Sequence, residues 1–293
     1  MSPRPVRKAV IPVAGYGTRF LPATKSLPKT MFPVLDKPVI QYVIEEAAAS
    51  GITDIAVITN PADRTIAEHF SRNGDLETWL DKKRRLDVLD GLRGLCSTVN
   101  LTFIPQSGPY GSGTPILNAK EFVAGEPFAV LLGDEIFVGE RPRLRQLLDA
   151  FERLDAPVFG VIETDDEGTR RYGIVDPGPE VSPGIVEMKG TMEKPGPDKA
   201  PSRLACVGSY VLTPDIFDHI SLDRKDERGE VSLVEAYNGL RKTRPFYAVK
   251  LAGEYYDTGT TTGWLRANIA LALKRDDLRS EIQDMLKGMN ESR

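Results

Sequence analysis

A glycine-containing loop near the start of the chain carries residue types suited to phosphate binding. It reads Ala14-Gly15-Tyr16-Gly17-Thr18-Arg19 and follows an apolar run at 9–13. Glycines let backbone N–H groups approach a phosphate, while Arg19 and the nearby Lys29 can neutralise its charge. A bare Gly-x-Gly would indicate only a turn. The loop lacks the third glycine of the dinucleotide fingerprint and the Gly-Lys-Ser/Thr of a Walker A loop, which disfavours hydride transfer and P-loop hydrolysis.

Two aspartates stand where apolar runs end beside glycines. Asp134 ends the run 129–133, and Asp257 precedes Gly259 after another apolar stretch. An aspartate leaving a parallel strand is often only a helix cap. Asp134 nevertheless falls on the same predicted sheet edge as the glycine loop, which is where α/β folds bind ligands.

Two further groups could contact a nucleotide and its reaction partner. Gln106 follows an apolar run at 99–104, and its amide can both donate to and accept from a pyrimidine edge, with Gly111 allowing close backbone approach. A solvent-exposed loop glutamine is the alternative. Glu193-Lys194-Pro195, taken alone, is a common surface tripeptide.

The surrounding elements predict an α/β fold. Strands are predicted at 9–13, 55–59, 99–104 and 128–132, and a helix is predicted between Pro38 and Gly51 with Asp36 as its N-cap. This βαβ order predicts a Rossmann-like, mostly parallel sheet flanked by helices.

The second half of the chain has a different pattern. From about Pro157 we expect shorter strands, a helix at 230–241, a strand at 246–249 and a helical C-terminus. We expect one domain over 1–293, with a first half at about 1–156 and a smaller β-rich extension at 157–293.

Composition limits the partners and the compartment. The 38 basic and 42 acidic residues give a net charge of −4, so neither nucleic acid nor an anionic membrane is attracted overall. Cys96 and Cys206 cannot build a disulfide framework and favour a reducing compartment. The first residues do not read as a signal peptide, and no run approaches the roughly 18 apolar residues of a membrane span. We therefore expect a cytoplasmic protein.

The order of these stretches is similar to that of a known family. KAVIPVAGYGTRFLPATKSLPK, DKPVIQYVIEEA, LLGDEIF, MEKP and YYDTGTTTGWLRANI resemble the sugar-1-phosphate nucleotidyltransferases, most closely the bacterial UTP:glucose-1-phosphate uridylyltransferases. The pattern HF…DLE…L resembles an insertion typical of the uridylyltransferases and favours them over the thymidylyltransferases.

The resemblance implies transfer of a uridylyl group from UTP to glucose 1-phosphate, giving UDP-glucose and pyrophosphate, with Mg²⁺ as cofactor. It implies that Asp134 and Asp257 hold the metal, that Gln106 and Gly111 read the base, and that the β-rich extension binds the sugar. The remaining implied site residues are Ala14, Gly15, Gly17, Arg19 and Lys29 for the triphosphate, Gly173 and Glu193 for the sugar, and Lys194 for its phosphate.

Several residues depart from the family pattern. Relatives usually carry Lys at position 110, His-Ala at 114–115 and Glu at 30, where this chain has Tyr110, Thr114, Pro115 and Thr30. These departures leave two alternatives open: a thymidylyltransferase, or a sugar-nucleotide-binding paralogue with impaired catalysis.

The C-terminal tail has an apolar helical face that bears on whether the chain forms a homo-oligomer. Five apolar residues share one helical face, which could pack on the parent domain or against a second copy: Leu278, Ile282, Met285, Leu286 and Met289. We expect a homo-oligomer, either a dimer or a tetramer.

Overall fold

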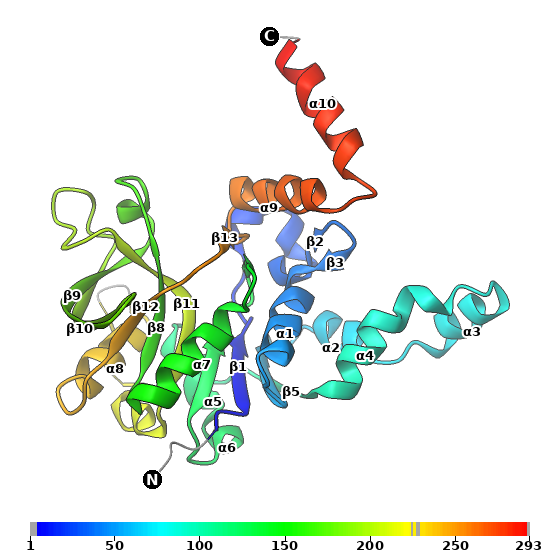
Figure 1. Cartoon of the computed structure of the whole chain (residues 1–293). Helices are drawn as coiled ribbons and strands as arrows, with labels where there is room; N and C mark the ends of the chain where they lie inside the picture. The colour runs from blue at the N-terminus through cyan, green and yellow to red at the C-terminus, as the bar shows by residue number, and fades with distance from the viewer. Residues whose placement is uncertain (1–4, 224, 227–228, 292–293) are drawn as a thin grey trace.

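A nine-stranded sheet lies at the centre of the molecule, with strand order β5-β4-β1-β6-β11-β8-β12-β10-β9 (Figure 1). The computed structural model describes residues 5–223, 225–226 and 229–291, so the first four residues of the N-terminal segment lie outside it. The strands of this sheet are β1 Lys8–Pro12, β4 Asp54–Thr59, β5 Asn100–Pro105, β6 Phe128–Leu131, β8 Val158–Glu163, β9 Gly173–Ser182, β10 Ile185–Glu193, β11 Leu204–Leu212 and β12 Tyr247–Lys250.

The first half of the sheet is parallel, as predicted. β1 pairs in parallel with both β4 and β6, and β4 pairs in parallel with β5. The four predicted strands are confirmed to within a residue or so at each end. Because the carboxyl ends of parallel strands meet at one edge, the segments after β1, β5 and β6 reach the same side of the sheet.

The second half of the sheet is mostly antiparallel and closes on itself. β11 pairs antiparallel with β6, β8 and β9, so the strands β11, β8, β12, β10 and β9 form a ring. The expectation of shorter strands here was wrong, since β9 spans 10 residues and β10 spans 9. Long antiparallel strands can pair along their whole length. Register shifts between β9 and β10 let the two strands stay paired although they contain glycine and proline.

Helices cover both faces of the sheet because buried side chains alternate along its strands. Ile11 faces the layer made by α1 and α7, whereas Val10 faces the layer that includes α5 and α8. The helices are α1 Val39–Ala49, α2 Thr65–Phe70, α3 Gly74–Lys82, α4 Asp90–Thr98, α5 Gly113–Asn118, α6 Lys120–Val123, α7 Arg143–Leu154, α8 Leu233–Leu240, α9 Thr261–Lys274 and α10 Arg279–Glu291.

The predicted role of Asp36 as the N-cap of α1 was wrong. A two-stranded hairpin of β2 Pro33–Val34 and β3 Lys37–Pro38 precedes the helix, and Asp36 lies in its turn. Pro38 stands at the cap position without a side-chain hydrogen bond, and Asp36 pairs with Arg275 instead. Pairing within the short hairpin therefore displaces the aspartate from the helix end.

Two helical segments project from the body of the molecule. The α3–α4 segment extends beyond the edge strand β5, and α10 extends away from α9 (Figure 1). Met285 and Met289 on α10 remain 43% and 61% exposed, whereas Leu278, Ile282 and Leu286 on the same face are partly buried. In the part of the chain described, no helix is long and apolar enough to cross a membrane.

A fully buried arginine ties the helical layer to the edge of the sheet. Arg143 at the start of α7 is 0% exposed and donates to Glu46 of α1 at 3.0 Å and to Glu135 at 2.8 Å. Glu135 begins the strand β7 Glu135–Val138 and also accepts from the Gly208 N–H and the Tyr255 hydroxyl. Burial raises the pKa of Glu135 to about 7, while the Arg143 charge acts to lower it.

Replacing Arg143 with methionine should destabilise the protein strongly. Removing one partner of a buried ion group leaves the others uncompensated, which costs about 3–5 kcal/mol. Urea unfolding of Arg143→Met measures this loss. Arg145→Met is the matched control on the same helix, because Arg145 forms partly exposed pairs with Asp149 and Glu152 and should cost no more than about 1 kcal/mol. Equal losses of unfolding free energy in the two variants would contradict the assignment of Arg143 to a buried ion-pair group.

Candidate active site

A two-stranded ribbon brings the two predicted metal-binding aspartates together. Asp134 follows β6, and the next residue starts β7. The strand β13 Glu254–Asp257 pairs antiparallel with β7 and places Asp257 opposite Glu135. The chain positions of the two aspartates are far apart, so this pairing is what sets them side by side.

The close approach of the two carboxylates depends on Gly259. A Cβ atom at this position would lie 2.5 Å from Asp134 Oδ2 and 3.1 Å from Asp257 Oδ1. The Thr258 N–H and hydroxyl both donate to the Asp134 carbonyl, at 3.0 and 2.7 Å. The turn after β13 is thus fixed against the turn before β7, and any larger residue at 259 would intrude on the carboxylates.

Each aspartate is paired with a basic side chain. Lys29 pairs with Asp134, and Arg171 Nη2 lies 3.3 Å from Asp257 Oδ2. Arg19 reaches the same turn, where its Nη1 lies 3.5 Å from the Gly259 carbonyl. The sequence interpretation missed Arg171, although the basic pair Arg170-Arg171 directly before Tyr172-Gly173 was an available signal.

The carboxylate pair is suited to a hard divalent cation. Burial raises the pKa of Asp257, and the neighbouring charge of Asp134 raises it further. A cation between the two would relieve this repulsion. Mg²⁺ commonly binds one or two carboxylates together with waters and substrate phosphate oxygens. The described residues contain no group of three or more His, Cys, Asp or Glu side chains able to hold a metal.

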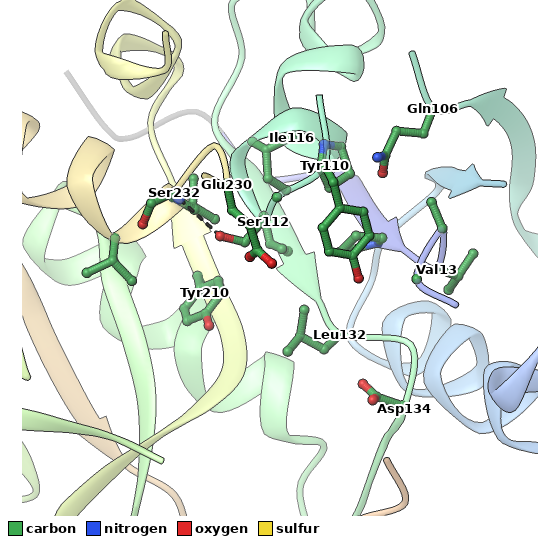
Figure 2. A pocket seen from close by; sticks show the side chains of 18 of the residues that line it. Val13, Gln106, Tyr110, Ser112, Ile116, Leu132, Asp134, Tyr210, Glu230 and Ser232 are labelled. Carbon is green, nitrogen blue, oxygen red and sulfur yellow. Dashed lines mark hydrogen bonds between the residues drawn. The ribbon is translucent and has the colours of Figure 1, made fainter. Parts of the chain in front are cut away.

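A cavity of about 580 Å³ opens beside Asp134. Figure 2 shows side chains from the first half of the chain, such as Gln106, and from the β-rich half, such as Tyr210, facing one another across it. Seven of the predicted site residues line it: Ala14, Gly15, Lys29, Gln106, Gly111, Asp134 and Glu193.

Other predicted residues lie outside that lining. Arg19 and Asp257 adjoin it through the Gly259 turn described above. Gly17 precedes the short turn Thr18–Phe20, and its carbonyl accepts from the Thr24 hydroxyl at 2.8 Å. Gly17 therefore shapes the loop without lining the cavity.

The loop that follows β5 is held firmly. The Gln106 N–H donates to Thr59 at 2.8 Å, and Val231 exchanges hydrogen bonds with Tyr110 at 3.0 Å and Gly113 at 2.9 Å. Gly111 has φ of 146°, and a Cβ there would overlap the backbone N and O of Val231. The structure thus requires glycine at 111 for packing against Val231, whereas its role in reading a base stays a prediction.

The predicted sugar-site residues meet where β9 and β10 pair. Gly173 is the direct partner of Glu193 in the antiparallel register, and both line a smaller cavity of about 110 Å³. Lys194 lines neither cavity. It has φ of 47°, a sparsely populated conformation for a residue other than glycine, and its Nζ lies 3.2 Å from Glu193 Oε1.

The sequence interpretation also missed a buried tyrosine. Tyr237 on α8 lines both cavities, and its hydroxyl is buried without a hydrogen-bond partner in the described structure. Its position beside the cavities could not be predicted from the sequence, because a tyrosine among the apolar positions of a helix is typical of a core residue.

One departure from the family pattern, Thr114, has a structural role. Thr114 is fully buried, and its hydroxyl donates to the Pro109 carbonyl at 2.6 Å, which closes the loop on itself. Thr30 and Pro115 line the large cavity. The Thr30 hydroxyl is buried and makes no hydrogen bond to any described residue.

Comparisons with known proteins agree with this architecture. The family model described as Nucleotidyl transferase matches residues 8–273. UTP--glucose-1-phosphate uridylyltransferase 2 of Staphylococcus saprophyticus is 41% identical over 97% of this chain and 98% of its own length.

Solved structures give the same result. A UTP-bound UGPase from Acinetobacter baumannii superposes with a TM-score of 0.88 at 34% identity, covering 96% of this chain and 98% of that protein. A UDP-glucose pyrophosphorylase complexed with UDP-glucose gives a TM-score of 0.82 at 31% identity, covering 92% of this chain and 100% of that one. The chain therefore belongs to the nucleotidyl transferase family, among the bacterial UTP:glucose-1-phosphate uridylyltransferases.

Proposed function

We propose that this chain transfers the uridylyl group of UTP to glucose 1-phosphate, giving UDP-glucose and pyrophosphate. The observation that carries the proposal is the meeting of Asp134 and Asp257 beside a cavity that has Gln106 on one wall and Glu193 on the other. Relatives bound to UTP and to UDP-glucose support the choice of donor and product.

Each part of the substrates has a place in this arrangement. The uracil edge lies against Gln106, and the triphosphate lies along the loop at Ala14 and Gly15, near Arg19 and Lys29. Glu193 and Gly173 contact the hexose, and Lys194 turns from Glu193 to the sugar phosphate. Charge-assisted contacts of this kind hold phosphates in fixed geometry.

Catalysis consists of positioning and charge neutralisation. A phosphate oxygen of glucose 1-phosphate attacks the α-phosphorus of UTP, and the bond from that phosphorus to the β-phosphate bridging oxygen breaks, so that pyrophosphate leaves. Held by Asp134 and Asp257, Mg²⁺ would neutralise charge on the phosphate oxygens. Arg19 and Lys29 stabilise the triphosphate, and Lys194 orients the attacking phosphate. No covalent intermediate is needed.

We also propose a compartment and an assembly. The free cysteines Cys96 and Cys206 support a reducing cytoplasmic setting. The exposed methionines of α10, Met285 and Met289, support a homo-oligomer, either a dimer or a tetramer.

Replacing either aspartate with asparagine should abolish most turnover while leaving the fold intact. The metal would lose a charged ligand at the reacting phosphates, so kcat should fall about a hundredfold or more. Pyrophosphate release measures kcat, and titration of UTP with and without Mg²⁺ shows whether the metal still strengthens binding. Asp166→Asn is the control, because this exposed aspartate pairs with Arg203 and lines neither cavity. Near wild-type turnover in Asp134→Asn would rule out the metal assignment.

Lys194→Ala should impair use of the sugar phosphate, whereas Lys29→Ala and Arg19→Ala should impair use of UTP. Loss of one charge-assisted contact costs about 1.5–3 kcal/mol, roughly tenfold to over a hundredfold in kcat/KM. Steady-state kinetics with each substrate varied in turn separates the two effects. Lys189→Ala is the control, because Lys189 lies on β10, the strand that ends just before Lys194, and is exposed. Unchanged kinetics for glucose 1-phosphate in Lys194→Ala would refute the sugar-site role.

A matrix of nucleoside triphosphates against sugar 1-phosphates should give UTP with glucose 1-phosphate as the best pair. Gln106 suits a pyrimidine edge, so ATP and GTP should be strongly rejected. Preference for UTP over dTTP should be weaker, because accommodating one methyl group is worth only about 1–3 kcal/mol. A preference for a purine would contradict the role of Gln106, and dTTP as the better donor would favour the thymidylyl alternative.

A further inference from the structure

Two exposed tyrosine rings meet at the nucleotide side of the cavity. Tyr16 comes from the glycine loop after β1 and is 67% exposed, and Tyr110 comes from the loop after β5 and is 52% exposed. Their ring centroids lie 6.1 Å apart, with 18° between the ring planes. Single exposed aromatic residues are ordinary, but two that stack across the ends of neighbouring loops leave a large flat apolar surface facing water.

One of these rings faces the space assigned to the base. Tyr110 lines the 580 Å³ cavity together with Gln106 and Gly15, and Figure 2 shows its ring pointing into the cavity. The Tyr110 hydroxyl lies 3.8 Å from the position of a Cβ on Gly15. The ring thus extends from the loop that carries Gln106 to the glycine loop at Gly15.

The backbone under Tyr110 is held in place. Its carbonyl accepts from Val231 at 3.0 Å, and Gly113 donates back to Val231 at 2.9 Å. Thr114 closes the other end of the loop through its bond to Pro109. A ring carried on a backbone fixed at these points loses little conformational freedom when a ligand packs against it.

We propose that Tyr110 is a stacking platform for the uracil base, and that Tyr16 supports it from the side away from the base. This inference rests on the proposed function, in which Gln106 binds the base edge. Hydrogen bonds at the edge leave the faces of the base free, and an aromatic face can cover one of them. Edge bonds select the base, whereas stacking strengthens binding of any base.

The test measures UTP and tripolyphosphate binding by calorimetry in the presence of Mg²⁺. Tyr110→Leu keeps much of the side-chain volume but loses the aromatic face, so its Kd for UTP should rise roughly tenfold, while its Kd for tripolyphosphate should not change. Tyr110→Phe should restore the affinity lost in Tyr110→Leu. Tyr16→Leu should weaken UTP binding by about two- to threefold, in keeping with an indirect role.

Two further readouts separate stacking from other roles. UTP and dTTP should lose affinity equally in Tyr110→Leu, and the KM for glucose 1-phosphate should stay unchanged. Trp79→Leu is the matched control, because Trp79 is a 56% exposed aromatic residue on α3 that does not line the large cavity.

Several outcomes would overturn the inference. An unchanged Kd for UTP in Tyr110→Leu would exclude stacking. Equal weakening of UTP and tripolyphosphate would indicate damage to the phosphate loop. If the wild-type protein bound tripolyphosphate but gained nothing from the uridine, the proposed function would fail and the stacking role with it.

Discussion

Negative charge gathers at the turn between β6 and β7, and the surrounding residues are arranged to balance it. Asp134 and Glu135 are adjacent in the chain, and β13 brings Asp257 opposite Glu135. Carboxylates this close in a partly buried region raise the free energy of the folded state unless cations or hydrogen-bond donors offset them. Each carboxylate is paired with a different cation: Lys29, Arg143 and Arg171.

The three cations differ in how freely they can leave their partners. Arg143 is fully buried and bonded to two glutamates, so it belongs to the framework that joins α1, α7 and β7. The side chains of Lys29 and Arg171 are 25% and 44% exposed. Neither pair is fully buried, so breaking it costs less than breaking a buried ion pair, and both cations remain accessible to solvent. The cluster thus combines one framework cation, Arg143, with two cations that reach solvent.

The cavity depends on contacts between the two halves of the chain. One wall is formed by loops after parallel strands, and the other wall includes Glu193 at the end of β10. Val231 bonds to the loop after β5 on both sides of Gly111, so the β-rich half directly holds the segment beside Gln106. Tyr110 lies on that same segment. Tyr110, one of the residues by which this chain departs from its relatives, is therefore fixed by a backbone contact that spans both halves.

The sequence by itself determined the parallel half of the sheet, the glycine loop and the residue types at the site. These signals are local: apolar runs predict buried strands, and glycines followed by cations directly after a strand favour a phosphate loop. Only the tertiary structure decided that β13 pairs with β7, that Arg171 reaches Asp257, and that Asp36 lies in a hairpin turn. It also decided that Tyr237 leaves a buried hydroxyl beside both cavities. Such contacts join residues far apart in the chain, and their energies depend on burial and distance, which no local pattern encodes.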